Sequence, residues 1–379
     1  MDTHYFRGDR WIWIIVFLLY AISIMSVYTS SRIIANGQNE LVLVKHITML
    51  FVTFVVLYIA HIANYNQLKR YAHMLVWVAI VLLALTFIAG KNINGEVRVL
   101  SIFGFSFQPS DLAKLAIIVL TSKILATHRQ QIHEWKTYQI VVVYTLILAG
   151  LIIISNFSTA FILVVNVLLL SYIGRIPIKH ISSIVLIGVM AFMMFVGYAS
   201  LSRKSYRINT WKNRILSFSK SFDKGRDDIT QADFANIAIA NAGILGKGAG
   251  HSIEANFIYA AHADFIYTII IEEYGLIGLI SIPLIYLIFL LRTIYIVKKS
   301  NTAFGALLAI GLCLNIILQA FVHMVVAVGS GLVTGQNLPL ISMGGTSLLF
   351  TSIGIGIILN VSQDIKDNEE QQNNNEASA

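Results

Sequence analysis

Charged side chains are scarce in this chain. Only 12% of its 379 residues are Asp, Glu, Lys or Arg, whereas 57% are hydrophobic. A soluble core of this length does not need so much apolar residue, so the composition excludes an ordinary soluble domain and predicts a polytopic membrane protein. Cysteine is nearly absent as well. The single Cys313 excludes an intramolecular disulfide.

Clusters of His and Cys with the spacing of metal ligands are also missing, so the sequence predicts no metal centre built from such ligands. Positive charge is in excess, with a formal net charge of +8. It lies mostly in short loops between apolar runs, which is typical of a membrane protein rather than of a nucleic-acid-binding protein. Anionic lipid headgroups or a phosphate-bearing substrate are the expected counterparts.

Long apolar runs predict about ten transmembrane helices, and hence an all-α integral membrane protein. No convincing cleavage site follows the first run, which favours a membrane helix over a signal peptide. The eighth run has about 33 residues, roughly 50 Å at 1.5 Å per residue, so it should tilt, break or protrude. The fifth and sixth should form a tight hairpin. The expected spans are 11–29, 42–64, 72–90, 109–127, 138–155, 157–174, 180–201, 264–296, 303–329 and 342–362.

Lys and Arg concentrate in one alternating set of the short segments between these spans. The positive-inside rule therefore places both termini in the cytoplasm and the long loop, about 202–263, outside. The fourth span carries Asp111, Lys114 and Lys123, so it should face other helices or water rather than lipid. After a membrane domain of residues 1–363, residues 364–379 are rich in Asn, Gln and Glu and are predicted to be a disordered cytoplasmic tail.

Three acids lie in or next to the eighth apolar run. A carboxylate in hydrocarbon costs several kcal/mol, roughly 3 on insertion scales, so each needs a partner, a water-filled cavity or a function. Asp264 is expected at the outer mouth of the helix, whereas Glu272 and Glu273 should lie about 12–14 Å further along it. Successive residues diverge by about 100°, so these two cannot face one partner in a regular helix. We interpret them as structural acids paired with buried polar groups.

A second charged pair opens the fourth span. Pro109 suits a first helical turn, Ser110 favours a cap, and Asp111 complements the helix dipole. Asp111 and Lys114 are spaced i, i+3 and can share a face. Two interpretations stay open: an ion pair that only neutralises itself, or a functional pair.

Glycines mark two further outer segments. Residues 243–252 hold four glycines and Lys247, which fits either a phosphate cradle or a re-entrant turn, but not a Walker A motif. In residues 334–347, Gly and Pro interrupt an apolar segment. Such an interruption lines a cavity or is buried in protein, while small residues also serve tight helix packing.

Four outer motifs, in this order and topology, resemble those of the bacterial SEDS family (shape, elongation, division and sporulation proteins, which include FtsW, RodA and SpoVE). The division-type members are more similar than the elongation-type ones, and the resemblance covers nearly the whole membrane portion. The motifs are Gln108-Pro109-Ser110 with Lys114, Gly246-Lys247-Gly248-x-Gly250, His262-x-Asp264-Phe265-Ile266 to Glu272-Glu273-x-Gly275, and Leu338-Pro339-x-Ile341-Ser342-x-Gly344-Gly345-x-Ser347.

The resemblance implies a peptidoglycan glycosyltransferase in the bacterial cytoplasmic (inner) membrane, at the division septum. Such proteins polymerise lipid II, a disaccharide-pentapeptide carried on undecaprenyl diphosphate, beside a class B penicillin-binding protein and other divisome proteins. A lipid II flippase, an elongation-type polymerase and a non-catalytic scaffold that recruits a synthase stay open as alternatives. So does a divalent cation, because one held mainly by diphosphate oxygens would leave no trace in the sequence.

Carried onto this chain, the family's essential acid falls on Asp264, which would take the proton of the attacking sugar hydroxyl as general base. Lys114 is the first candidate to stabilise the diphosphate leaving group. The other expected substrate-binding residues are Asp111, Arg98, Lys247, Arg214, His262 and Ser342, and the expected structural residues are Glu272, Glu273, Pro339, Gly344 and Gly345.

The chain departs from the family pattern at several positions. Asp111 stands where members usually carry Glu, and Arg98 is the only Arg left of a Gly-Ala-Arg-Arg-Trp stretch. An acid of the fifth-to-sixth hairpin is replaced by Asn156. The Leu-Pro-Glu before the histidine is here Ile258-Tyr259-Ala260. These changes indicate a divergent lineage and leave Asp264 and Lys114 in place.

Overall fold

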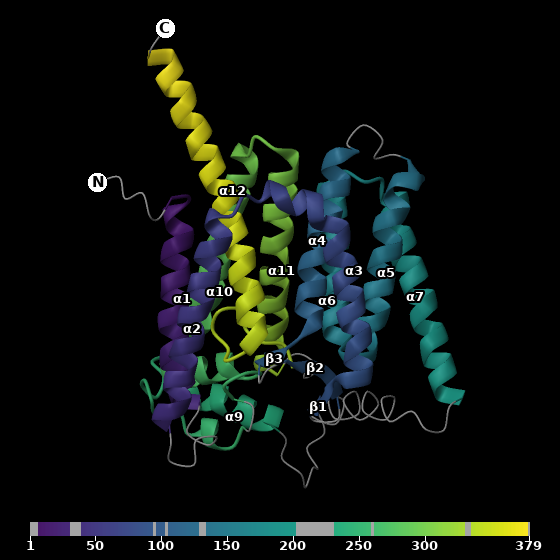
Figure 1. The fold of residues 1–379 in the computed structure, drawn as a ribbon. Coiled ribbons are helices and arrows are strands. Elements are labelled where there is room, and N and C mark those ends of the chain that lie inside the picture. The colour runs from purple at the N-terminus through teal and green to yellow at the C-terminus, as the bar shows by residue number, and fades with distance from the viewer. Residues whose placement is uncertain are drawn as a thin grey trace.

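The computed structural model describes residues 7–30, 39–93, 96–102, 105–128, 134–201, 231–258, 261–329 and 335–377. This part of the chain forms a bundle of long helices (Figure 1), as the apolar runs predicted. The helices are α1 (Arg10–Ser30), α2 (Asn39–Ile62), α3 (Asn66–Ala89), α4 (Pro109–Thr127), α5 (Trp135–Ser155), α6 (Phe157–Ile173), α7 (Ile178–Leu201), α10 (Ile266–Lys299), α11 (Ala303–Ala327) and α12 (Gly345–Ala377).

Seven of the described helices are long and apolar enough to cross a membrane, and α6 and part of α7 add two shorter apolar helices. The two chain ends lie at the same end of the bundle (Figure 1). The opposite end carries the short helix α9 (Gln231–Ala242) and a small sheet. The chain is therefore a multi-pass membrane protein. The part of its long loop that begins with α9 lies on the face opposite the termini.

Helix α4 lies in the interior of the bundle. It packs against α3, α5, α6, α11 and α12, and most of its residues are buried, including Asp111 and Lys114. The charges of α4 had predicted that it faces helices or water rather than lipid, and the packing confirms it. The predicted hairpin is also present, because α5 ends at Ser155 and Asn156 caps α6 by accepting a hydrogen bond from the Thr159 amide at 3.2 Å.

Helix α10 breaks at Gly275, which has a φ of 59° and a ψ of −137°. The two parts then pack on each other, since Tyr267 donates a hydrogen bond from its hydroxyl to the Leu279 carbonyl at 2.7 Å. The break confirms that the eighth span is too long to run straight. It leaves residues 276–299 as the membrane-crossing part, about 36 Å at 1.5 Å per residue against a hydrocarbon core of about 30 Å.

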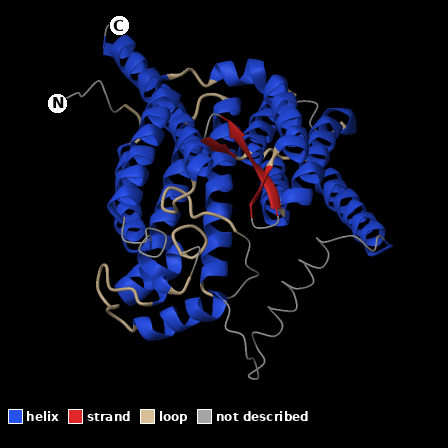
Figure 2. Ribbon diagram, turned by 60° about the horizontal axis from the view of Figure 1, so that its bottom comes forward, coloured by secondary structure: helices blue, strands red, loops and turns tan. Residues whose placement is uncertain are grey.

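A three-stranded antiparallel sheet precedes α4 (Figure 2), in the order β1 (Lys91–Ile93), β2 (Glu96–Ile102) and β3 (Phe105–Phe107). Ile93 pairs with Glu96 where β1 and β2 meet, and residues 94–95 between them lie outside the described residues. The Phe107 ring packs edge-on against Phe350 of α12, with centroids 5.8 Å apart. The sheet thus ties the start of α4 to the start of α12.

The end of α12 differs from the sequence expectation. The helix continues through Ala377 and projects beyond the bundle (Figure 1), where disorder was expected from residue 364. The segment contains Glu and Gln, which favour helix, and has neither Gly nor Pro to break it. Composition pointed to a solvated segment but did not exclude a helical one.

Candidate active site

Asp111 and Lys114 form an ion pair in the first turns of α4. Their Oδ1 and Nζ atoms lie 2.9 Å apart, and the side chains are only 4% and 5% exposed. The Lys114 ammonium also donates a hydrogen bond to Gln319 Oε1 of α11 at 3.0 Å. Buried charges persist when they are paired and hydrogen-bonded in this way. The i, i+3 spacing therefore does bring the two side chains together, and α11 supplies a third member.

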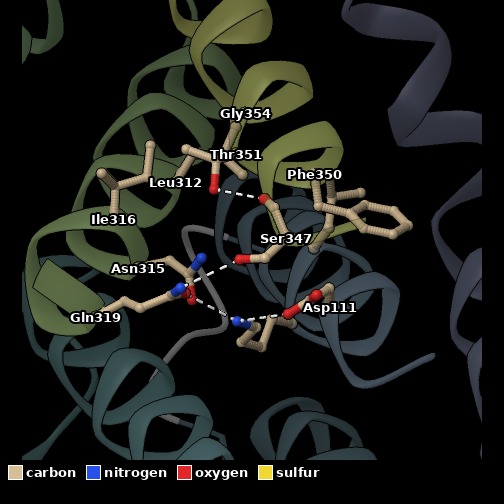
Figure 3. A pocket seen from close by; sticks show the side chains of 11 residues that line it. Asp111, Leu312, Asn315, Ile316, Gln319, Ser347, Phe350, Thr351 and Gly354 are labelled. Atoms are coloured by element: carbon tan, nitrogen blue, oxygen red, sulfur yellow. Dashed lines mark hydrogen bonds and ion pairs between the residues drawn. The ribbon is translucent and has the colours of Figure 1, made fainter. Parts of the chain in front are cut away.

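Gln319 connects this pair to the start of α12. Its Nε2 donates to the Asn337 carbonyl at 3.0 Å and to Ser347 Oγ at 3.3 Å. A cavity of about 20 Å³ lies among Asp111, Lys114, Gln319, Ser347 and neighbouring residues (Figure 3). That is roughly the room for one water molecule.

Two oxygens that line this cavity are buried and have no hydrogen-bond partner within the described residues. They are Asp111 Oδ2 and Asn315 Oδ1. Unpaired buried oxygens are costly, so the cavity is suited to a group that donates hydrogen bonds, such as water or a substrate hydroxyl.

The polar face of α11 was missed by the sequence analysis. Asn315, Gln319 and His323 are spaced by four residues and lie on one side of an otherwise apolar helix. His323 Nδ1 is hydrogen-bonded to the Gln336 carbonyl at 2.7 Å, and Gln336 in turn donates to Thr159 Oγ1 at 2.8 Å. The signal was available, because polar residues recurring on one helical face inside a membrane span rarely face lipid.

The loop 335–344 has an ordered, turn-rich backbone. The Ile341 and Ser342 amides both donate to the Leu338 carbonyl, at 3.1 and 2.9 Å, and Leu340 adopts a positive φ of 63°. Gly344 allows the Asn337 side chain to approach, since a Cβ at that position would lie 2.2 Å from Asn337 Nδ2. The Pro339 carbonyl accepts a hydrogen bond from the Tyr286 hydroxyl at 2.5 Å.

This loop holds the segment that precedes Asp264. Ser342 Oγ accepts from the Leu338 amide at 2.8 Å and donates to the Ala263 carbonyl at 2.7 Å. The Met343 amide donates to the His262 carbonyl at 3.0 Å. Asp264 is half-buried two residues before α10 begins, where the helix dipole favours a carboxylate. The loop 335–344 therefore positions the backbone of Asp264 while Gln319 ties the same loop to Lys114.

His262 is half-buried, and burial lowers the pKa of its imidazole from the usual 6.5. Its Nδ1 has no partner among the described residues. Behind the loop, Ser23 donates from its hydroxyl to the Ile341 carbonyl at 2.7 Å and contacts His46 Nε2 at 2.8 Å. Because Ser23 has one hydroxyl hydrogen, His46 must donate from Nε2. The contact braces the loop from α1 and α2.

The glycine loop, residues 243–252, surrounds Glu272 and Glu273. Lys247 Nζ lies 2.6 Å from Glu272 Oε1, and the Ile253 amide and the Ser252 hydroxyl also donate to this carboxylate. The Gly250 amide donates to Glu273 Oε1 at 2.8 Å. The loop does cradle an anion with backbone N–H groups, but the anion is the protein's own carboxylate. Lys247 is accordingly engaged with Glu272.

The remaining expected residues are placed as follows. Arg98 lies in β2, and its side chain is outside the described residues, as is the whole of Arg214. Gly345 begins α12. Within the described part of the chain, no three His, Cys, Asp or Glu side chains come together as a metal site.

Comparison with known proteins identifies relatives of similar length. "Probable peptidoglycan glycosyltransferase FtsW" of Geobacter sulfurreducens is 29% identical over 369 residues, covering 95% of this chain and 96% of that protein. The Geobacter metallireducens protein of the same name is 31% identical over 309 residues, covering 80% of each.

Two solved structures share the fold. Rod shape determining protein RodA of Thermus thermophilus has a TM-score of 0.69 at 21% identity, covering 96% of this chain and 99% of that one. A chain from a peptidoglycan synthase complex has a TM-score of 0.73 at 23% identity, covering 94% and 98%. The family model for cell cycle proteins of the FtsW, RodA and SpoVE type matches residues 9–367. The chain therefore belongs to the FtsW/RodA/SpoVE family of cell cycle proteins.

Proposed function

We propose that this protein is a peptidoglycan glycosyltransferase that polymerises lipid II at the outer face of the bacterial cytoplasmic membrane during cell division. The relatives at 29% and 31% identity are named probable peptidoglycan glycosyltransferase FtsW, which supports the glycosyltransferase part of the proposal. The main support for the proposal is the loop 335–344, which hydrogen-bonds the backbone just before Asp264. The same loop is connected to the Lys114 ammonium through Gln319. The proposed base and the proposed cation are thus both connected to this loop, Lys114 by way of Gln319.

In the proposed reaction, a sugar hydroxyl attacks the anomeric carbon of a donor whose leaving group is a lipid diphosphate. Asp264 takes the hydroxyl proton as general base, because it is a half-buried acid at the mouth of α10. Lys114 stabilises the negative charge that develops on the diphosphate. Asp111 and Gln319 hold the Lys114 ammonium in position until the diphosphate arrives.

The remaining expected residues divide into two groups. We assign Glu272, Glu273 and Lys247 to the structure of the outer loop, because each already has a partner there. His262 and Ser342 fix the Asp264 segment through a backbone carbonyl and a hydroxyl. With both termini cytoplasmic, as the basic residues predict, this end of the bundle faces outward, beside a class B penicillin-binding protein that crosslinks the strands.

The test is a lipid II polymerisation assay of the protein reconstituted with its cognate transpeptidase. Asp264→Asn should abolish glycan polymer while leaving the thermal midpoint unchanged. Glu40→Gln, which alters an exposed carboxylate in the first turn of α2, is the matched control and should polymerise normally. Full polymerisation by Asp264→Asn would overturn the assignment of the base. Movement of lipid II across vesicles without any polymer from the wild-type protein would instead identify a flippase.

A further inference from the structure

The glycine loop exposes two large apolar residues, Ile244 and Leu245, directly after α9. Ile244 is 73% exposed and Leu245 is 80% exposed. Gly243 and Gly246, both with positive φ, turn the chain on either side of them, and residues 241–246 contain no charged side chain. We call Ile244 and Leu245 the loop tip. Neither residue belongs to the proposed active site, so the exposure of the tip needs its own explanation.

Backbone hydrogen bonds hold this tip against the break in α10. The Glu272 carbonyl accepts from the Lys247 amide at 2.9 Å. The Leu276 amide donates to the Ile244 carbonyl at 3.0 Å. In a regular helix the Leu276 amide would donate to the Glu272 carbonyl, and the break at Gly275 separates the two. The loop partners both groups, and its tip lies at the side of the break where the membrane-crossing part begins.

The depth of the tip follows from a comparison of α10 with α1, which packs beside it. Arg292 of α10 pairs with Asp9, the residue just before α1, so the two helices meet the same membrane boundary there. From that boundary α1 rises about 30 Å between Arg10 and Ser30, which matches the hydrocarbon core. Between Arg292 and Leu276, α10 rises only about 24 Å. The break and the tip therefore lie about 6 Å inside the hydrocarbon, on the side opposite the chain termini.

The tip also continues an apolar surface of α10. Ile277 and Ile280, in the first turns after the break, are 64% and 55% exposed and share one face of the helix. Exposed apolar residues on a membrane-crossing helix face acyl chains. Since Ile244 is bonded to the residue next to Ile277, the tip and this face are adjacent. In water, two such exposed side chains would be unfavourable, whereas acyl chains would cover them together with α10.

We propose that the loop tip inserts among the acyl chains of the leaflet on the side opposite the chain termini. The Ile244 and Leu245 side chains contact lipid, while the Ile244 carbonyl stays paired with α10, as non-helical backbone at membrane depth requires. The inserted tip anchors residues 243–252 to the bilayer, and with them the part of α10 before Gly275. Asp264 lies just before that part of α10, so the anchor sets its height relative to the lipid.

Spin labels on the tip test the proposal in the full chain, reconstituted alone in vesicles of phosphatidylglycerol and phosphatidylcholine. Cys313→Ala removes the single native cysteine, and Ile244→Cys or Leu245→Cys then carries the nitroxide. Electron paramagnetic resonance measures collisions of the label with oxygen, which enters the acyl chains, and with a nickel chelate, which stays in water. Both tip labels should collide more with oxygen than with the nickel chelate.

Two further labels provide the matched controls. Ile277→Cys, on the adjacent face of α10, should also favour oxygen, whereas His251→Cys, exposed in the same loop, should favour the nickel chelate. Because both tip residues are largely exposed, their labelled variants should keep the thermal midpoint of the Cys313→Ala protein. Collisions of both tip labels mainly with the nickel chelate would overturn the insertion and place the tip in water. Few collisions with either reagent would overturn the lipid assignment and indicate that a second copy of the chain covers the tip.

Discussion

Lys114 of α4 and Gln319 of α11 meet at 3.0 Å inside the bundle, far apart in the sequence and both buried. Asp111 completes the arrangement from the other side of the ammonium. The side-chain Nε2 of Gln319 donates hydrogen bonds to the Asn337 carbonyl and to Ser347 Oγ. The position of the lysine is therefore set by three helices and by the loop that also holds the Asp264 segment.

The Asp111–Lys114 pair can be tested for function separately from stability. Lys114→Ala should abolish lipid II turnover, but it also leaves Asp111 buried without its cation, at a cost of about 3–5 kcal/mol. The double variant Asp111→Asn, Lys114→Gln removes both charges and should regain most of the lost thermal stability. If the pair is functional, its polymerisation stays lost. Recovery of polymerisation together with stability would identify an ion pair that is only structural.

Gln319 should behave as a positioning residue for Lys114. Gln319→Leu keeps approximate volume but removes the acceptor for Lys114 and the donors to Asn337 and Ser347. We expect the KM for lipid II to rise and the turnover rate to fall. The lost hydrogen bond to the Lys114 ammonium is worth about 1.5–3 kcal/mol, so kcat/KM should fall roughly tenfold or more. Gln67→Leu, the same substitution at an exposed glutamine in the first turn of α3, is the control. Equal losses in the two variants would contradict a specific role for Gln319.

The bundle could be predicted from the sequence because hydrophobicity acts locally. Each apolar run must form a helix in lipid to satisfy its backbone, so the spans follow from residue order alone. The small sheet before α4 was not predicted, since its strands are short and their partners are set by contact with α12. The helical end of α12 was also not predicted. Its polar composition indicates exposure to solvent, but it does not show whether the segment continues the helix that precedes it.

The candidate site could be predicted only in part. Asp264, Asp111 and Lys114 stand out as charges in apolar surroundings, which the sequence displays directly. Gln319 and Asn315 are uncharged, and their importance depends on which side of α11 faces α4. The glycine loop was suited to an anion in general, but only the fold shows that Glu272 fills it. A bound anionic ligand and a carboxylate of the protein itself accept the same hydrogen bonds from backbone N–H groups. The sequence alone therefore does not show which of the two fills the glycine loop.

Gly246 and Gly275 should tolerate no side chain. A Cβ on Gly246 would lie 2.1 Å from the Glu273 carbonyl oxygen, and its φ of 76° is unfavourable for other residues. Gly246→Ala should therefore destabilise the protein by more than about 3 kcal/mol. Gly243→Ala is a matched comparison, because its φ is also positive but nothing lies within 4 Å. It should cost only about 1–2 kcal/mol. Similar thermal midpoints for the two variants would contradict the close approach of the loop and α10.

Glu272 should contribute to folding rather than to catalysis. Glu272→Ala removes the acceptor of Lys247, Ser252 and the Ile253 amide and should cost about 3–5 kcal/mol. The fraction that remains folded should polymerise lipid II at the wild-type rate per molecule. Adding Lys247→Met should worsen stability by less than the sum of the single effects, because both act on one pair. A folded but inactive Glu272→Ala protein would instead assign this acid to the reaction.

His262 should make the Asp264 segment sensitive to acid. Burial lowers the pKa of His262 below its usual 6.5, so between that lowered pKa and 6.5 the unfolded chain binds more protons than the folded one. Stability from the neutral imidazole is then fully present above pH 6.5 and is lost as the pH falls below that value. In the His262→Asn variant, the thermal unfolding midpoint should depend less on pH below 6.5 than it does in the wild-type protein. The substitution His251→Asn, at an exposed histidine of the outer loop, is the comparison. An unchanged slope in His262→Asn would mean that another group governs the acid sensitivity.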